Sequence, residues 1–357
     1  MSDITTKQMT ARPYIIGWLL FVAFLIFIMV IIGGATRLTG SGLSITEWKP
    51  ILGALPPLNL ADWQDAFEKY KEIPQYHQIN KGMSLDEFKS IFWWEWSHRF
   101  FGRFIGVAFL LPFLFFLGTG RVEKKLQPKL WLLFALGGLQ GFVGWYMVSS
   151  GLVDRTDVSQ YRLALHLGLA VFIFAAIMWV VLSLKANSGE ATKAASGGTV
   201  RDADGVVKTG AFIVLALIFL QIIAGAFVAG MKAGFAYNSW PLMNGHFIPS
   251  GLDAMSPFWR NLFENALTVQ FNHRMIAYLI LIVLVVHLVQ CLRRGQGEHI
   301  ASAAVLMLAA LGQVFIGIMT LLQGVKLDLA LAHQGGALVL LTAALWHYHR
   351  LSYKASK

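Results

Sequence analysis

Glu95-Trp96-Ser97-His98-Arg99 lies near the start of a long apolar segment that covers residues 91–118, and the rest of the chain is arranged around it. Glu95 and His98 are three residues apart, so they share one face of a helix. A carboxylate and an imidazole are costly in hydrocarbon, and such groups inside a membrane segment indicate a functional site. This stretch therefore predicts a membrane helix with a polar face directed at other protein groups.

Three further histidines, His166, His273 and His333, each lie near the start of another apolar segment. Neutral imidazole is a common axial ligand of haem iron, and the bilayer core offers no water to satisfy it otherwise. Four imidazoles at equivalent depth therefore suggest a bound metal or haem.

The composition is that of an integral membrane protein. Of the 357 residues, 56% are hydrophobic and only 13% are charged, whereas a soluble domain averages about 25% charged residues. The net charge of +10 could indicate a nucleic-acid partner, but the basic residues concentrate in alternate connections between apolar segments. We therefore expect no nucleic-acid binding.

Eight apolar segments reach the roughly 20 residues needed to span a bilayer. Because eight is even, both termini lie on one side, and the positive-inside rule makes that side cytoplasmic. The N-terminus has neither a cleavable signal nor a transit-peptide pattern, so we expect a multi-pass protein of a bacterial inner membrane. The segments are 13–34, 91–118, 130–149, 161–185, 209–230, 263–291, 300–322 and 330–350.

Outside the spans, residues 60–72 and 84–90 alternate apolar and charged positions at helical spacing. We expect two short helices on the outer membrane surface. Cys291 is the only cysteine, so no intrachain disulfide or cysteine cluster can form. We interpret it as a small buried hydrophobe.

The two halves of the chain repeat each other. Span two reads Glu95-Trp96-Ser97-His98-Arg99 where span six reads Gln270-Phe271-Asn272-His273-Arg274. Span four reads Leu-Ala-Leu-His up to His166, and span eight reads Ala-Leu-Ala-His up to His333. In each span a tryptophan follows thirteen residues after the histidine. Further matches are Gly33/Gly225, Gly42/Gly234, Trp48/Trp240, Gln140/Gln313 and Gly144/Gly317.

This repeat predicts an all-α membrane protein of two pseudo-symmetric four-helix bundles, residues 13–185 and 209–350, joined by a cytoplasmic linker at 186–208. Each bundle supplies two histidines, enough to hold one porphyrin between helices. Position 95 is Glu, whereas its counterpart Gln270 cannot ionise. One pocket therefore has a potential acid/base group, which fits one reactive and one electron-carrying pocket.

The motifs resemble those of the haem A synthase family over essentially the whole chain. They are Gly-Gly-Ala-Thr-Arg-Leu-Thr-Gly-Ser-Gly-Leu-Ser from Gly33, Glu-Trp-Ser-His-Arg, Leu-His-Leu-Gly at 165–168, Phe-Asn-His-Arg at 271–274 and Ala-His-Gln at 332–334. The resemblance implies an oxidoreductase that converts the C8 methyl of haem O to a formyl group, making haem A for cytochrome oxidase.

The resemblance also implies the site. A haem b cofactor would sit between His273 and His333, and substrate haem O would be handled between His98 and His166, with all four histidines as haem-iron ligands. Glu95 matches the family's essential glutamate and is, with His98 and His166, a catalytic candidate. The resemblance further implies an electron donor of the ferredoxin kind, haem O synthase, cytochrome oxidase assembly factors and other copies of the chain as partners in the bilayer.

Several polar residues near the candidate ligands have predicted roles of their own. Arg99 and Arg274 are candidates for binding haem propionates, since guanidinium matches carboxylate geometry; contact with lipid headgroups is the alternative. Glu95 could instead be held in an ion pair by Arg99 or Arg103. We interpret the intramembrane residues Gln140, Gln221 and Gln313 as interhelical hydrogen-bonding groups.

His287 and His347 lie fourteen residues beyond His273 and His333, about 21 Å further along each helix. This spacing motivates a rival function, a bis-histidine b-type cytochrome that transfers electrons across the membrane. A haem carrier or assembly factor is the third alternative. We expect His287 and His347 to be solvated near the cytoplasmic interface rather than to hold a further haem.

Overall fold

Each long apolar segment forms a helix in the computed structural model, which describes residues 3–49, 52–153, 155–195, 204–294 and 297–352. In these residues eight helices are long and apolar enough to cross a membrane, and no β-strand is present. The predicted all-helical membrane fold with eight spans is therefore confirmed. The eight helices are α1 (Asp3–Leu38), α4 (Leu85–Gly118), α5 (Gln127–Ser149), α6 (Gln160–Ala195), α7 (Gly205–Gly230), α9 (Ala266–Arg294), α10 (Gly297–Leu322) and α11 (Leu327–Ser352).

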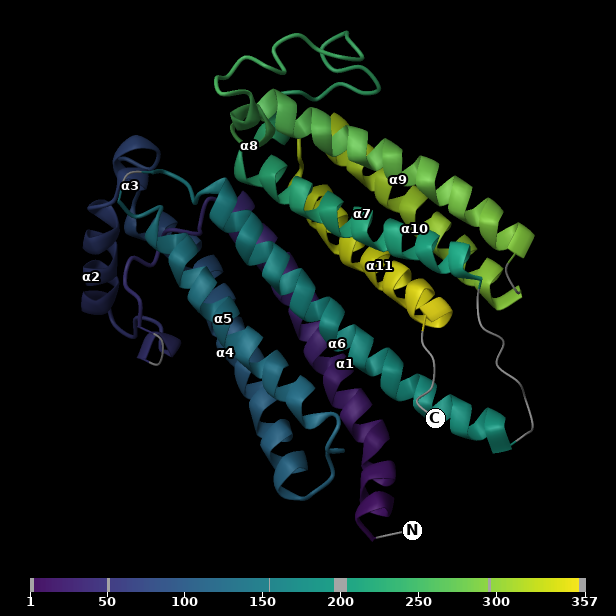
Figure 1. Ribbon diagram of the computed structural model, residues 1–357. Coiled ribbons are helices and arrows are strands. Elements are labelled where there is room, and N and C mark those ends of the chain that lie inside the picture. Colours follow the sequence, from purple (N-terminus) through teal and green to yellow (C-terminus); the bar gives the residue numbers. More distant parts are fainter. Residues whose placement is uncertain (1–2, 50–51, 154, 196–203, 295–296, 353–357) are drawn as a thin grey trace.

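Four of these helices form the centre of the molecule. α1, α6, α7 and α11 pack against one another, α4 and α5 flank them on one side, and α9 and α10 flank them on the other (Figure 1). The main apolar core draws buried side chains from all eight helices. The central helices therefore fix the position of the flanking helices that carry His98 and His273.

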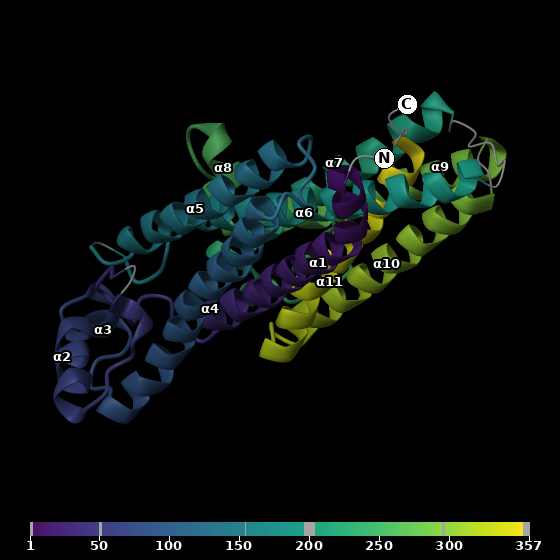
Figure 2. The same ribbon diagram turned by 90° about the horizontal axis from the view of Figure 1, so that it is seen from below.

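The two long connections lie at the same end of the helices. Residues 39–84, with α2 (Leu60–Lys71) and α3 (Pro74–Gln78), and residues 231–265, with α8 (Asn261–Glu264), are both found there (Figures 1 and 2). The start of α1 and the end of α11 lie at the opposite end. Both described ends of the chain thus lie at the end away from the long connections.

The predicted surface helix at 60–72 is confirmed by α2, but the predicted separate helix at 84–90 is wrong. Ser84 caps α4: its hydroxyl accepts a hydrogen bond from the Glu87 backbone N–H, and the Glu87 carboxylate accepts one from the Ser84 backbone N–H. This capping box starts a helix at Leu85. Residues 85–90 are therefore the first turns of the same helix that carries His98.

The first long connection has a core of its own. Its aromatic side chains stack on the first turns of α4, where Phe67 and Phe88 are 5.0 Å apart between ring centroids. Tyr70 is fully buried, and its hydroxyl donates to the Gln75 amide oxygen at 3.0 Å. The buried residues of this outer cluster are Leu43, Phe67, Tyr70, Ile73, Phe88 and Phe92.

The region predicted as a linker is largely helical where it is described. α6 continues to Ala195 and α7 begins at Gly205, so both helices extend into the range 186–208. Residues 196–203 of that range lie outside the described residues. Asp204 caps α7, because its carboxylate accepts a hydrogen bond from the Val206 backbone N–H at 2.7 Å.

Candidate functional site

Each of the four predicted ligand histidines packs against a glycine of the neighbouring helix. A Cβ added to the glycine would lie within about van der Waals contact of the imidazole Cε1 or closer, so the absence of a side chain creates the space for each ring. The pairs, with the distance from such a Cβ to Cε1, are Gly33 and His98 at 3.0 Å, Gly144 and His166 at 2.9 Å, Gly225 and His273 at 3.1 Å, and Gly317 and His333 at 2.7 Å.

His273 of α9 and His333 of α11 face each other. Their ring centroids are 6.5 Å apart, with the ring planes at 80°. Two metal–nitrogen bonds of about 2 Å each, together with the inner half of each ring, account for such a separation. Nδ1 of His273 is buried and has no hydrogen-bond partner among the described residues. The pair therefore fits a haem iron bound between the two imidazoles.

His98 of α4 and His166 of α6 form the corresponding pair in the first half. His98 lies near enough to His166 for the two rings to influence each other electrostatically, as His273 and His333 do. Nδ1 of His98 is also buried and makes no hydrogen bond to the described part of the chain. The structure thus brings all four predicted ligands together as two pairs.

Three glutamines hold three of these histidines. The side-chain amide of Gln140 donates to the His166 carbonyl at 3.0 Å, Gln221 to the His273 carbonyl at 2.9 Å, and Gln313 to the His333 carbonyl at 2.7 Å. Each amide also lies within 3.1 to 3.3 Å of an imidazole nitrogen of the same histidine. The predicted interhelical hydrogen bonds are confirmed, but sequence reasoning did not identify the histidines as their partners.

A signal in the sequence could have identified these partners. Each glutamine stands four residues before the glycine that contacts its histidine, as in Gln221 and Gly225. The fourth glycine, Gly33, has Met29 at that position. His98 is therefore the one histidine of the four whose matching position cannot supply an amide.

Glu95 is buried and held by four hydrogen bonds. One carboxylate oxygen accepts from the Ser44 hydroxyl and from the Ile45 backbone N–H, both at 2.8 Å. The other oxygen accepts from Nε of Arg99 at 3.0 Å and from its terminal nitrogen at 2.6 Å. The ion pair considered from the sequence is therefore present, with Arg99, and Glu95 also fastens the first long connection, residues 39–84, to α4.

The Arg99 guanidinium is hydrogen-bonded to the first long connection. Besides Glu95, it donates to the backbone carbonyls of Ile45 at 2.7 Å and Glu47 at 3.0 Å. Hydrogen bonds from Lys49 and Lys69 lower the pKa of the Glu47 carboxyl, which keeps that loop residue ionised. Arg99 thus anchors the first long connection to α4, at the residue that follows His98.

Gln270 and Arg274 occupy the matching positions in the second half but bond differently. The Gln270 amide donates to the carbonyls of Ala233 and Tyr237, and Arg274 donates to Tyr237 and Gln270, each at 3.1 to 3.2 Å. Two further Arg274 nitrogens, Nε and one terminal nitrogen, are buried without a partner among the described residues. Arg274 can therefore bind an anionic group such as a propionate, whereas most donors of Arg99 are already used.

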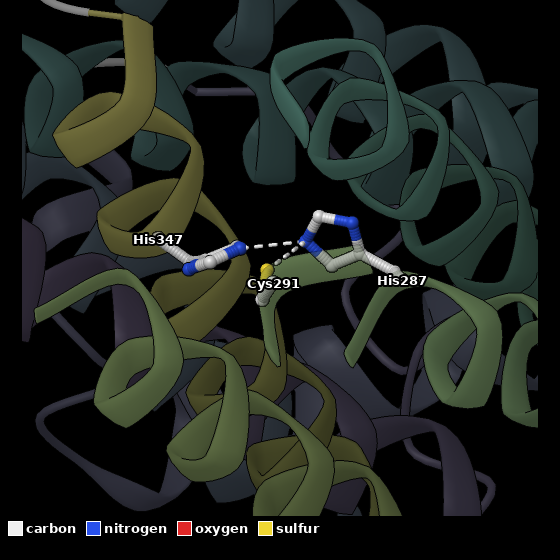
Figure 3. A group of neighbouring side chains, drawn as sticks. All are labelled: His287, Cys291 and His347. Carbon is white, nitrogen blue, oxygen red and sulfur yellow. Dashed lines mark hydrogen bonds between the residues drawn. The ribbon is translucent and has the colours of Figure 1, made fainter. Parts of the chain in front are cut away.

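His287 and His347 are not solvated, and that prediction is wrong. Both are buried, with 1% and 0% of their surface exposed. Their Nε2 atoms lie 2.7 Å apart, with Cys291 beside them (Figure 3). Helix packing buries these rings even though they lie near the helix ends. Two metal–nitrogen bonds of about 2 Å in line do not fit in 2.7 Å, so the pair does not fit a further haem.

Comparison with known proteins gives a consistent result along the whole chain. Residues 17–345 match the family model COX15-CtaA, described as cytochrome oxidase assembly protein. A protein of Parvibaculum lavamentivorans named heme A synthase is 56% identical over 335 residues, 94% of this chain and 93% of its own length. Proteins of the same name from Bradyrhizobium diazoefficiens and Azorhizobium caulinodans are 51% and 54% identical, covering 99% and 92% of this chain and 96% and 92% of their own length.

The matched range runs from the middle of α1 to near the end of α11, and it includes both histidine pairs, Glu95 and both long connections. Taken with the paired histidines and the glycines that make room for them, this match leaves one assignment: the chain belongs to the COX15-CtaA family of cytochrome oxidase assembly proteins.

Proposed function

We propose that this protein is a haem A synthase, an oxidoreductase that converts the C8 methyl group of haem O to a formyl group. The observation that carries the proposal is a difference between the two histidine pairs of the described residues: Glu95 stands three residues before His98, whereas Gln270 stands three residues before His273. The relatives that bear this name are similar over almost their full length. Each of two successive hydroxylations of the methyl carbon consumes one O2, two electrons and two protons and releases one water, and the resulting gem-diol loses a further water to give the aldehyde.

The architecture that goes with this function is a pair of pseudo-symmetric four-helix bundles, residues 13–185 and 209–350, with a linker at 186–208. Matching helix contacts support it: α1 packs on α4 as α7 packs on α9, and α5 packs on α6 as α10 packs on α11. We place both termini in the cytoplasm and the protein in a bacterial inner membrane. The long connections, with Glu95 and His98 beside the first, then lie toward the outer face.

The second bundle holds haem b in this proposal. His273 and His333 would hold the iron, and the side-chain amides of Gln221 and Gln313 hold the backbone carbonyls of these two histidines. Arg274 offers its unpaired donors to a propionate. When bound, this haem supplies one-electron transfer chemistry. The protein groups hold the two imidazoles rigid, which suits a site that changes oxidation state without changing ligands.

The first bundle receives haem O between His98 and His166. His166 is fixed by Gln140, whereas His98 has Met29 at the matching position and can move more freely. A histidine that can leave or approach the substrate iron suits a site that must admit one porphyrin and release another. Arg99 and Glu95 hold the first long connection over this pocket.

Glu95 is the proton-handling group of the proposal. Its carboxylate accepts a hydrogen bond from the Ser44 hydroxyl at 2.8 Å, and Arg99 keeps the carboxylate in one orientation. General acid–base catalysis by a positioned carboxylate contributes about 10²–10⁴-fold to a rate. The amide of Gln270 cannot exchange a proton in this way, so the second pocket is limited to binding and electron transfer.

The reaction requires partners of defined chemistry. Haem O must be supplied by a haem O synthase, and the product passes to assembly factors of cytochrome oxidase. Electrons must come from a one-electron donor, for which a ferredoxin-like protein is suitable. The hydrophobic tail of haem O also requires the lipid bilayer next to the pocket, and copies of the same chain can associate there.

Product analysis tests the proposal directly. The protein is expressed with a haem O synthase in a host that makes no haem A, and the haems are extracted and weighed by mass spectrometry. We expect haem A, or its alcohol precursor, only when the protein is present. Haem O left unchanged beside a protein fully loaded with haem b would contradict a synthase and support the cytochrome alternative.

A further inference from the structure

A second cluster of ligand-type side chains lies at the opposite end of the helices from the long connections. His287 and Cys291 come from the last turns of α9, and His347 comes from the last turns of α11. Their surfaces are 1%, 0% and 0% exposed. In the described residues this is the one group of three such side chains whose ligand atoms lie within 4.8 Å of one another.

The donor atoms converge on one point. Nε2 of His287 and Nε2 of His347 are 2.7 Å apart, and the Cys291 sulfur is 3.6 Å from Nε2 of His287 (Figure 3). In the figure both imidazole rings direct their Nε2 edges toward each other with the sulfur beside them. With metal–nitrogen bonds of about 2 Å, the two nitrogens need to separate by less than about 1 Å to bind one ion.

The Nδ1 atom of one of the two imidazoles, that of His347, has a hydrogen-bond partner. Nδ1 of His347 lies 2.8 Å from the hydroxyl of Ser302, a fully buried residue of α10. Nδ1 of His287 is buried without a hydrogen-bond partner among the described residues, and so is the Gln290 amide oxygen near it. Partners at Nδ1 fix a histidine tautomer and leave Nε2 as the ligand atom, as they do around bound metals.

The charge of the cluster selects the ion. One thiolate and two neutral imidazoles carry a charge of −1, so a monovalent cation gives a neutral complex, whereas a divalent one leaves a net positive charge in a buried site. Thiolate and imidazole ligands suit soft ions such as Cu(I) and Zn(II). We propose that His287, Cys291 and His347 form a binding site for one Cu(I) ion. On binding, the Cys291 thiol loses its proton to solvent as the copper–sulfur bond forms, and no electron is transferred.

A pocket lies next to the cluster. The pocket, of about 310 Å³, reaches the side chains that surround His287. Gly210 and Gln290 line it and also lie directly against the imidazole. The pocket is lined by Gly205, Val206, Thr209, Gly210, Ile213 and Gln290. Because these residues come from the start of α7 and the end of α9, the pocket opens at the end opposite to the long connections.

Copper binding by the purified, haem-loaded protein tests the site. Cu(I) is titrated anaerobically against a coloured Cu(I) chelator, and copper, zinc and iron are counted by mass spectrometry. We expect one Cu(I) per chain beyond the haem iron. Cys291→Ser should weaken the affinity for Cu(I) by more than roughly 100-fold. Ser302→Ala removes only the hydrogen-bond partner of a ligand histidine, and such a loss already lowers metal affinity by about 10–100-fold.

The matched control is His349→Ala. His349 is a buried histidine of α11 that contacts Ser183 and Trp179, and because it is not one of the three proposed ligands, this variant should bind Cu(I) as the wild type does. Equal affinity in Cys291→Ser, or uptake of Zn(II) but not Cu(I), would overturn the proposal. If Cys291→Ser does not fold, copper-edge X-ray absorption of the wild type decides: one sulfur and two nitrogens support the site, and nitrogen and oxygen alone overturn it. Haem iron serves as the separate readout for the histidine pairs.

Discussion

The two histidine pairs have similar frames but different hydrogen bonds around them. Both pairs bring a histidine from the second helix of a half to one from the fourth, and all four rings rest against glycines. In the first half, Glu95 and Arg99 bind each other and the first long connection. In the second half, Gln270 donates to backbone carbonyls and Arg274 keeps two buried nitrogens unpaired.

Under the proposed function, this difference lets one helical frame serve two tasks. A pocket that keeps its cofactor benefits from rigid ligands and from cationic donors left available for propionates. A pocket that turns over a substrate benefits from a covering segment, a proton-handling group and one ligand that is less constrained. The substitutions below exchange or remove the residues that make the difference.

The largest effect is expected at Glu95. Glu95→Gln keeps the size of the side chain and can still accept hydrogen bonds from Ser44 and Ile45, but it cannot carry a proton. We expect conversion of haem O to fall by about 10²–10⁴-fold, with normal haem b content, as measured by haem extraction. Normal conversion in this variant would remove Glu95 from proton transfer and leave it a purely structural role.

The next largest effect separates the two arginines. Arg274→Ala should weaken haem b retention by about 10–100-fold, because charge-assisted hydrogen bonds to a propionate contribute about 1.5–3 kcal/mol. Arg99→Ala should leave haem b in place and loosen residues 39–84, which limited proteolysis detects. The rate of haem transfer to apomyoglobin measures retention. Similar haem b loss in both variants would contradict the assignment of Arg274 to the propionate.

A smaller effect is expected from exchanging the residues at matching positions beside the first histidine of each pair, Met29 for His98 and Gln221 for His273. Gln221→Met removes the hydrogen bond to the His273 carbonyl and should destabilise the haem b pocket by about 1 kcal/mol, seen as faster haem loss on heating. Met29→Gln is the matched variant and should restrict His98 and slow substrate turnover. If Gln221→Met retains haem as the wild type does, the amide is not a support for the ligand.

The smallest effect concerns the glycines. A Cβ at Gly225 would lie 3.1 Å from His273, and one at Gly33 would lie 3.0 Å from His98. The ring must then move by a few tenths of an ångström. Gly225→Ala should shift the absorption spectrum of haem b, and Gly33→Ala should leave that spectrum unchanged while slowing conversion a few-fold. A spectral shift in Gly33→Ala alone would reverse the assignment of the two pockets.

Much of this arrangement could be predicted from the sequence because hydropathy and repetition report on burial. The eight spans follow from long apolar runs, and His98, His166, His273 and His333 are marked by their matching positions. The helix at 60–71 follows from its charge pattern. These predictions need only the period of the helix and the cost of polar groups in hydrocarbon.

The remaining features depend on how helices rotate against one another. The bond of Gln313 to His333, the hold of Arg99 on Glu47 and the contact of His287 with His347 each join segments at least 20 residues apart. Hydropathy carries no information on such pairings. It also placed His287 and His347 in solvent, because nearness to a helix end does not indicate whether a neighbouring helix covers the ring.

The most direct test of the central claim is the haem inventory of His98→Ala and His273→Ala, two matched variants expressed with a source of haem O. We expect His273→Ala to lose haem b, whereas His98→Ala keeps one haem b per chain and makes no haem A. Loss of haem b from both variants alike, or from neither, would contradict a division of the two histidine pairs between substrate and cofactor.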